Sequence, residues 1–205
     1  MATNQKTTRM VQIALLAGIE VLLAFTPLGY IPIGPVRATT IHIPVILGGI
    51  LLGPAAGGLL GGVFGLTSVL INTITPTVTS FVFTPFYSLG ESRGNFWSLV
   101  IAMVPRILIG VVAGRVFRLM MRVQKNTGLA AALSGFLGSM TNTILVMGGI
   151  YVFFGPAYAQ ARGIAYSTLM GVIGGVISFN GVIEAIAATA ITIPLAAVLR
   201  KVVRR

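Results

Sequence analysis

Long apolar stretches with almost no charge constrain this chain more than any other feature. Hydrophobic residues make up 56% of its 205 positions and charged residues only 8%, whereas a soluble domain carries about 25% charged residues. The acidic residues are Glu20, Glu91 and Glu184, and Asp is absent. A surface exposed to water cannot be covered with so few charges, so the solvent of this chain must be lipid. We therefore predict an all-α integral membrane protein.

The apolar stretches divide into six predicted helices. A hydrocarbon core about 30 Å thick needs about 20 apolar residues per helix. Gly53-Pro54 splits one long apolar run and Gly155-Pro156 ends another, because proline cannot continue a helix, while the proline- and glycine-rich residues 28–36 predict a loop. Within a single domain, the predicted membrane-spanning helices cover residues 10–25, 40–53, 54–74, 98–116, 128–153 and 167–199.

Basic residues gather in three clusters, which predict the orientation of the chain. With six helices, all three clusters fall on one face of the membrane, and an excess of Lys and Arg marks the cytoplasmic face. Both termini are therefore predicted to be cytoplasmic. The net charge of +11 is explained by these helix ends, so no nucleic acid partner is expected. The clusters are Lys6 and Arg9; Arg115, Arg118, Arg122 and Lys125; and Arg200, Lys201, Arg204 and Arg205.

Several kinds of chemistry lack the residues that they need. There is no Cys, and His42 is the only histidine, so we expect no metal site and no cofactor. None of the three lysines lies in a phosphate-binding loop of the G-x-x-x-x-G-K-[ST] type. A Ser–His–Asp triad is impossible without Asp. The chain is therefore predicted not to be an enzyme and not to hydrolyse ATP itself.

Polar residues at membrane depth are the candidates for ligand binding. Arg106 lies about two turns into the fourth predicted helix, Asn142 lies in the middle of the fifth, and Asn180 and Glu184 are one turn apart on the sixth. A charge at this depth usually faces a cavity or a partner. A guanidinium group fits a carboxylate and an amide fits hydroxyl groups, so these residues predict a site for a small polar anion. The alternative is a structural ion pair of Arg106 with Glu184 or Glu20.

Residues 75–97 form a long segment rich in aromatic and hydroxyl side chains. Phe81, Tyr87 and Trp97 are candidates to close over a bound ligand and exclude water. The alternative for these aromatic residues is a belt at the membrane interface.

Small residues recur at four-residue spacing, which lets helices approach closely in lipid. We predict that most of these rows, such as Gly57, Gly61 and Gly65, pack inside the bundle. Ala14 and Gly18 lie near the cytoplasmic end of the first helix, where a partner protein is able to dock.

Six segments resemble a known family. The chain is similar to the substrate-binding S component of an energy-coupling factor (ECF) vitamin transporter, and most similar to the pantothenate-specific members. Arg37, in the second of these segments, joins the candidate substrate-binding residues. The segments are residues 25–29 (FTPLG), 37–46 (RATTIHIPVI), 49–54 (GILLGP), 76–81 (PTVTSF), 104–110 (VPRILIG) and 141–143 (TNT).

The resemblance implies a location, a ligand and partners. It implies a six-helix protein of a prokaryotic plasma membrane in which Arg106 and Asn142 contact pantothenate. The implied partners are a membrane coupling subunit and two ATPase subunits. Family members meet the coupling subunit through an Ala-x-x-x-Ala-like row on the first helix, to which Ala14 and Gly18 are the nearest match.

Other functions stay open on the sequence. The vitamin could instead be a hydroxymethylpyrimidine or B6-type compound, riboflavin or cobalamin, although Arg106 favours an acid over neutral riboflavin. A stand-alone secondary transporter would be supported by inverted repeats, and no clear repeat is found. A non-transporting assembly factor is favoured only if the polar residues pair with one another.

Overall fold

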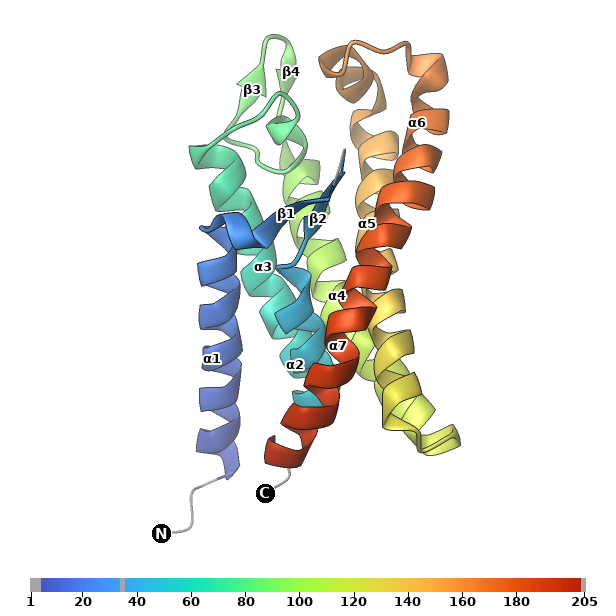
Figure 1. The fold of residues 1–205 in the computed structure, drawn as a ribbon. Coiled ribbons are helices and arrows are strands. Elements are labelled where there is room, and N and C mark those ends of the chain that lie inside the picture. The colour runs from blue at the N-terminus through green and yellow to red at the C-terminus, as the bar shows by residue number, and fades with distance from the viewer. Residues whose placement is uncertain (1–4, 34–35, 204–205) are drawn as a thin grey trace.

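The chain folds into an elongated bundle of helices (Figure 1). A computed structural model describes residues 5–33 and 36–203. Within this part of the chain, five helices are long and apolar enough to cross a membrane, which confirms a multi-pass membrane protein. They are α1 (Gln5–Ala24), α3 (Pro54–Ile74), α4 (Phe96–Val123), α5 (Thr127–Ala161) and the continuous span Tyr166–Arg200.

Both ends of the described chain lie at the same end of the bundle (Figure 1). We call this the terminal end, and it is formed by the start of α1 and the finish of α7 (Val182–Val203). The opposite end carries the short strands β3 (Ser88–Leu89) and β4 (Ser92–Arg93), and we call it the β3–β4 end. The two ends of the described chain therefore lie at the end of the bundle opposite the strands β3 and β4.

The second predicted helix, residues 40–53, is shorter than a membrane span. Helix α2 (His42–Leu52) has 11 residues, which gives a length of about 16 Å, roughly half of the hydrocarbon core. Every residue from His42 to Ile50 is buried. Helix α2 is thus a central core helix, and a sixth full crossing is not established.

The loop predicted for residues 28–36 contains regular structure. A 3₁₀ turn (Pro27–Gly29) leads into strand β1 (Tyr30–Ile33), which pairs antiparallel with β2 (Val36–Thr39). In Figure 1 this hairpin lies above α2, between α3 and α7. Proline and glycine predicted a loop, but the backbones of these two short segments pair with each other as strands.

The glycine row of α3 packs inside the bundle, as predicted, and it brings α3 and α4 into backbone contact. A Cβ at Gly57 would lie 2.6 Å from the carbonyl oxygen of Gly110, and one at Gly61 would overlap the carbonyl of Arg106. Only glycine leaves room for this approach. The contact fixes the part of α4 that carries Arg106 against α3.

Several helices extend beyond their predicted bounds. Helix α1 begins at Gln5 rather than at residue 10, and α4 runs to Val123 rather than to residue 116. The cause is that Lys and Arg are good helix formers, so the helices continue past their apolar parts. Helix α5 continues through Gly155-Pro156 to Ala161. Gly155 serves close packing here, because a Cβ on it would lie 2.8 Å from the ring of Tyr166.

The last predicted helix, residues 167–199, is an unbroken rod with a change of helix type. Helix α6 (Leu169–Gly175) follows a 3₁₀ turn (Tyr166–Thr168) and continues through a π-helical segment (Val176–Gly181) into α7. A π-helical turn within a helix often marks a functional site. This segment includes Asn180.

Candidate substrate-binding site

A proline in α4 determines how the Arg106 side chain is held. Pro105 has no N–H, so the carbonyl of Ile101, four residues earlier, loses its usual helical donor. The Arg106 Nη1 donates a hydrogen bond of 2.7 Å to that carbonyl. The Pro-Arg pair therefore fixes one edge of the guanidinium group to its own helix.

Two aromatic rings flank the same guanidinium group. The Arg106 Cζ lies 5.5 Å from the ring centre of Phe64 on α3 and 5.2 Å from that of Phe83. At this distance a cation is attracted to the ring face. Arg106 is only 7% exposed. Its charge is thus buried and oriented before any ligand arrives, which lowers the entropy cost of binding.

Contacts between the helices place Arg106, Asn142 and His42 at one depth. Gly138 of α5 lies against Ile46 and Ile109, since a Cβ on it would be 3.2 Å from Ile46 Cγ1 and 3.4 Å from the Ile109 carbonyl oxygen. Helix α5 runs antiparallel to α2 and α4 (Figure 1). One turn from this contact, towards the β3–β4 end, the three helices carry His42, Arg106 and Asn142.

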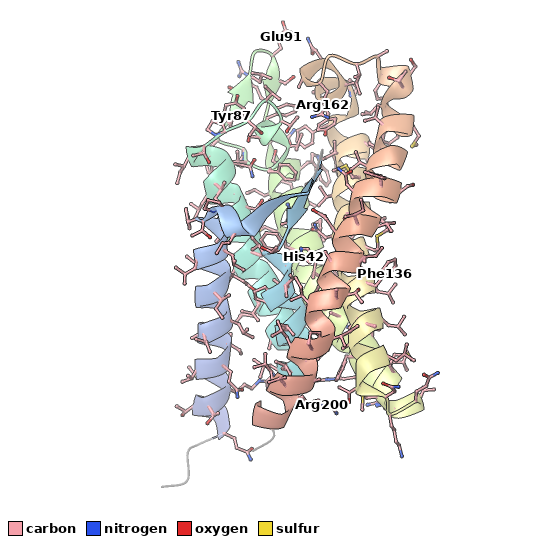
Figure 2. The ribbon with its side chains drawn as sticks, in the orientation of Figure 1. His42, Tyr87, Glu91, Phe136, Arg162 and Arg200 are labelled. Atoms are coloured by element: carbon pink, nitrogen blue, oxygen red, sulfur yellow. The ribbon has the colours of Figure 1, made fainter. Side chains whose placement is uncertain are left out.

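Two of these side chains present polar atoms that the described protein does not satisfy. The Asn142 Oδ1 and the His42 Nε2 are buried and have no hydrogen-bond partner among residues 5–33 and 36–203. His42 is 2% exposed and lies in the centre of the bundle in Figure 2. Buried polar atoms are nearly always hydrogen-bonded in proteins, so a ligand or water is expected to serve them.

Glu184 on α7 and Asn180 in the preceding π-helical segment lie near the depth of Arg106 and Asn142. The Thr39 N–H, at the end of β2, donates a 2.9 Å hydrogen bond to Glu184 Oε1. Gly181 packs against Thr143, with 2.8 Å between its added Cβ and Thr143 Cγ2, so the neighbouring Asn180 lies beside the part of α5 that carries Asn142. Glu184 thereby anchors the β1–β2 hairpin next to this level.

Glu20 does not form the predicted alternative ion pair with Arg106. Its side chain is fully buried on α1, and neither carboxylate oxygen has a hydrogen-bond partner in the described part of the chain. Helix α1 contacts α2 and α3, whereas Arg106 lies on α4.

The three aromatic candidates occupy different environments. Phe81 is fully buried and packs edge-on against Phe154, with ring centres 5.9 Å apart, and Tyr87 packs at the border of the same cluster. Trp97 is 43% exposed and stacks on Phe153 at 4.0 Å. Phe81 and Tyr87 thus form a core beneath the β3–β4 end, while Trp97 lies on the outer surface.

Two further candidates differ in what the structure describes. Arg37 lies on β2, opposite Pro32, and its side chain is outside the described part of the molecule. Ala14 and Gly18 are exposed on α1, and a Cβ on Gly18 would have no atom within 4 Å. This row therefore faces away from the bundle and is not internal packing.

Comparisons with known proteins agree with the architecture. Residues 8–196 match the family model described as the substrate-specific component of ECF transporters. The chain belongs to this family. It is 38% identical over 168 residues to the pantothenic acid transporter PanT of Lactococcus lactis subsp. cremoris, covering 82% of this chain and 80% of that protein. The pantothenate transporter PanT of Leuconostoc mesenteroides is 32% identical over 192 residues, covering 90% and 88%.

Family membership identifies the protein as a transporter component rather than an enzyme. The sequence singles out Arg106 and Asn142, but not Phe64 and Phe83, which flank the Arg106 guanidinium group, nor His42, which lies at the same depth. Phe64 reads as an ordinary apolar residue and Phe83 only as one aromatic residue of segment 75–97, while His42 was considered as a metal ligand or a member of a catalytic triad. The signal for His42 was a lone histidine at the start of an apolar helix, five residues after the candidate Arg37 in the chain.

Proposed function

We propose that this protein is the pantothenate-binding component of an ATP-driven ECF importer. The observation that carries the proposal is the buried, preoriented Arg106 guanidinium at the same depth as Asn142. Pantothenate has a carboxylate for the guanidinium group, and hydroxyl and amide groups for the asparagine. The two relatives named as pantothenate transporters support this choice of vitamin.

His42 and the hairpin complete the proposed site. The His42 Nε2 and the Asn142 Oδ1 are two buried atoms with unfilled hydrogen-bonding capacity, and they are suited to the polar groups along the ligand. The β1–β2 hairpin, held by Glu184 through Thr39, borders this level of the bundle.

The energy for transport comes from partner subunits in this proposal. The chain has no phosphate-binding loop, so ATP hydrolysis belongs to two ATPase subunits, linked through a membrane coupling subunit. The exposed Ala14–Gly18 row offers the coupling subunit a close helix contact. The terminal end, with its basic clusters, is cytoplasmic.

Ligand identity is tested by calorimetry on the purified chain. Pantothenate is expected to bind with one site per chain, while riboflavin, cobalamin and hydroxymethylpyrimidine produce no saturable heat. Saturable binding of one of these vitamins without pantothenate binding would reassign the substrate.

Coupling to ATP is tested by uptake of radiolabelled pantothenate into cells that lack their own carrier. Uptake is expected only when the coupling subunit and both ATPases are expressed with this chain. Concentrative uptake by the chain alone would instead establish a secondary transporter.

The orientation of the chain is tested by labelling single cysteines. A cysteine at Gln124 should be labelled only from the cytoplasm and one at Ser92 only from outside.

A further inference from the structure

Four arginines line one groove at the terminal end of the bundle. The groove has a volume of about 720 Å³ and lies between α1, the start of α3 and the last turns of α4. Its remaining lining is apolar. The complete lining is Arg9, Pro54, Ala55, Val111, Arg115, Arg118, Leu119 and Arg122.

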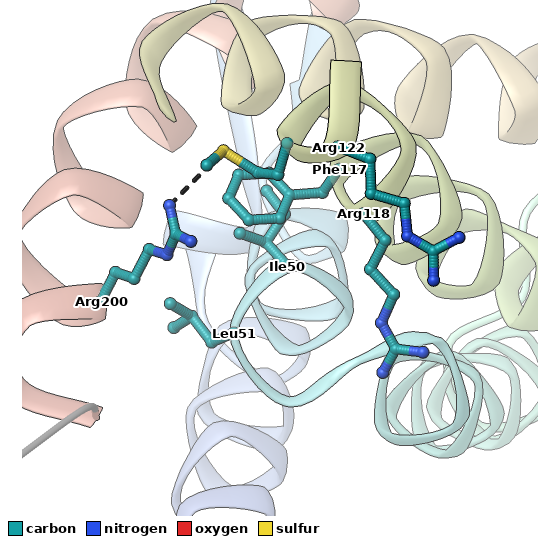
Figure 3. Close-up of a pocket in the computed structure, with 7 residues that line it drawn as sticks. Ile50, Leu51, Phe117, Arg118, Arg122 and Arg200 are labelled. Carbon is teal, nitrogen blue, oxygen red and sulfur yellow. Dashed lines mark hydrogen bonds between the residues drawn. The ribbon is translucent and has the colours of Figure 1, made fainter. Parts of the chain in front are cut away.

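Three of the arginines form a single stripe on α4. Arg115, Arg118 and Arg122 are separated by three and four residues, which places them on one face of the helix. All three are exposed. Figure 3 shows a second pocket, which Arg118 and Arg122 line together with Arg200. The guanidinium groups of Arg118 and Arg122 lie on the opposite side of this pocket from Arg200, which donates a 2.8 Å hydrogen bond to Thr127 Oγ1. All three arginines of the stripe line the groove.

Two guanidinium groups meet at the turn between α2 and α3. Arg9 Nη2 donates a 3.1 Å hydrogen bond to the carbonyl of Leu52. Arg118 lies so close to Gly53 that a Cβ there would overlap its Nη2, and Gly53 has a φ of 97°, which favours glycine. The groove thus brings cations from α1 and α4 to the same turn.

The chain has no acidic side chain that can neutralise this cluster. Glu20 is eleven residues along α1 from Arg9, about 16 Å away along the helix axis. Glu91 lies in the turn between β3 and β4, and Glu184 binds the Thr39 N–H. Like charges repel strongly near a low-dielectric surface, so the groove is suited to an anion from outside the chain.

The lining also determines what kind of anion fits. Val111 and Leu119 extend the groove along α4 on the same face as the arginines, and Leu119 is 60% exposed. Such a site accommodates a phosphate group beside a hydrocarbon chain, and basic pockets between membrane helices bind anionic lipid headgroups. We propose that this groove binds the phosphate headgroup of an anionic membrane phospholipid, with an acyl chain along Val111.

The test is a lipid titration of the purified full chain. Native mass spectrometry would count bound phosphatidylglycerol, with phosphatidylcholine as the neutral comparison. Phosphatidylglycerol is expected to bind at one site and phosphatidylcholine only weakly. Each arginine replaced by glutamine should lower the affinity about five-fold, so the triple variant Arg115→Gln, Arg118→Gln, Arg122→Gln should lose about 100-fold.

The control variant is Lys125→Gln, which removes an exposed charge near the same end but outside the groove. It should change the affinity less than two-fold. Equal losses for Lys125→Gln and the single variant Arg115→Gln would mean diffuse surface charge and would refute the site. Arg115→Gln also serves if the triple variant does not fold, and pantothenate calorimetry reports on folding.

Two other occupants would also overturn the proposal. Displacement of the lipid by inorganic phosphate at equal concentration would indicate a site for a free anion, because the acyl chain would then contribute nothing. Equal binding of phosphatidylglycerol and phosphatidylcholine, with Arg115→Gln weakening only association with the coupling subunit, would indicate a protein-docking groove.

Discussion

Truncation of Arg106 is the sharpest test of the proposed substrate site. Removing one member of a buried, hydrogen-bonded charge pair typically costs about 2–5 kcal/mol. Arg106→Ala is therefore expected to weaken pantothenate binding about 30-fold to several-thousand-fold. The upper part of this range applies if the guanidinium binds both carboxylate oxygens through the edge that the Ile101 carbonyl does not occupy.

The same truncation has a structural cost that must be measured separately. Without Arg106 Nη1, the Ile101 carbonyl loses its donor beside Pro105, and an unsatisfied buried carbonyl costs about 1–3 kcal/mol. The variant should therefore unfold at a lower temperature than the parent. Arg106→Lys keeps the charge but lacks the planar fork, so it should restore binding only in part.

Calorimetry with two ligands separates carboxylate recognition from these structural effects. Pantothenol, in which a hydroxyl replaces the carboxylate, should bind the parent weakly and lose little more in Arg106→Ala. The two proteins and two ligands close a double-mutant cycle. Arg162→Ala is the matched control, because Arg162 is exposed near the β3–β4 end and its removal tests long-range attraction alone.

A coupling energy near zero in this cycle would refute the reasoning. It would mean that Arg106 stabilises α4 through the Ile101 carbonyl and the rings of Phe64 and Phe83 but does not bind the ligand carboxylate. An equal loss of binding in Arg162→Ala would instead indicate attraction by the overall positive charge of the protein.

Four further substitutions test other parts of the structure. Asn142→Ala should weaken pantothenate binding about 2- to 12-fold at unchanged thermal stability, because the buried Asn142 Oδ1 has no hydrogen-bond partner in the described chain. A large loss of stability would instead assign Asn142 a structural role. Gly61→Ala should lower the unfolding temperature, because its Cβ would overlap the α4 backbone. Gly62→Ala is the control and should leave the unfolding temperature unchanged, because a Cβ there has no atom within 4 Å. Equal melting curves for the two variants would contradict the packing argument. Gly18→Leu should reduce copurification with the coupling subunit and leave calorimetric binding intact, since the position is open; unchanged copurification would remove the row from the interface. Glu20→Met should raise the unfolding temperature, because a fully buried carboxyl group without a described hydrogen bond is replaced by an apolar side chain; a loss of binding would show that Glu20 acts in the site.

Composition and local pattern were enough to determine the class of fold. The scarcity of charge requires lipid as solvent, and the apolar runs give the five spanning helices because a helix satisfies its own backbone in lipid. The glycine spacing likewise predicted close packing inside the bundle, although it did not say which helices meet. Arg106 and Asn142 stood out for a related reason, since polar groups at membrane depth are too costly to be incidental.

Only the tertiary structure decided how distant residues meet. It is not possible to tell from the sequence that α2 is a buried core helix, because an apolar run has the same pattern whether it faces lipid or protein. Nor could the sequence place His42 at the same depth as Arg106 and Asn142, or bring Arg9 to the turn that Arg118 covers. These juxtapositions depend on how antiparallel helices pack in three dimensions. The small residues that touch determine which residues of two helices lie at the same depth, and no local sequence pattern shows which small residues will touch.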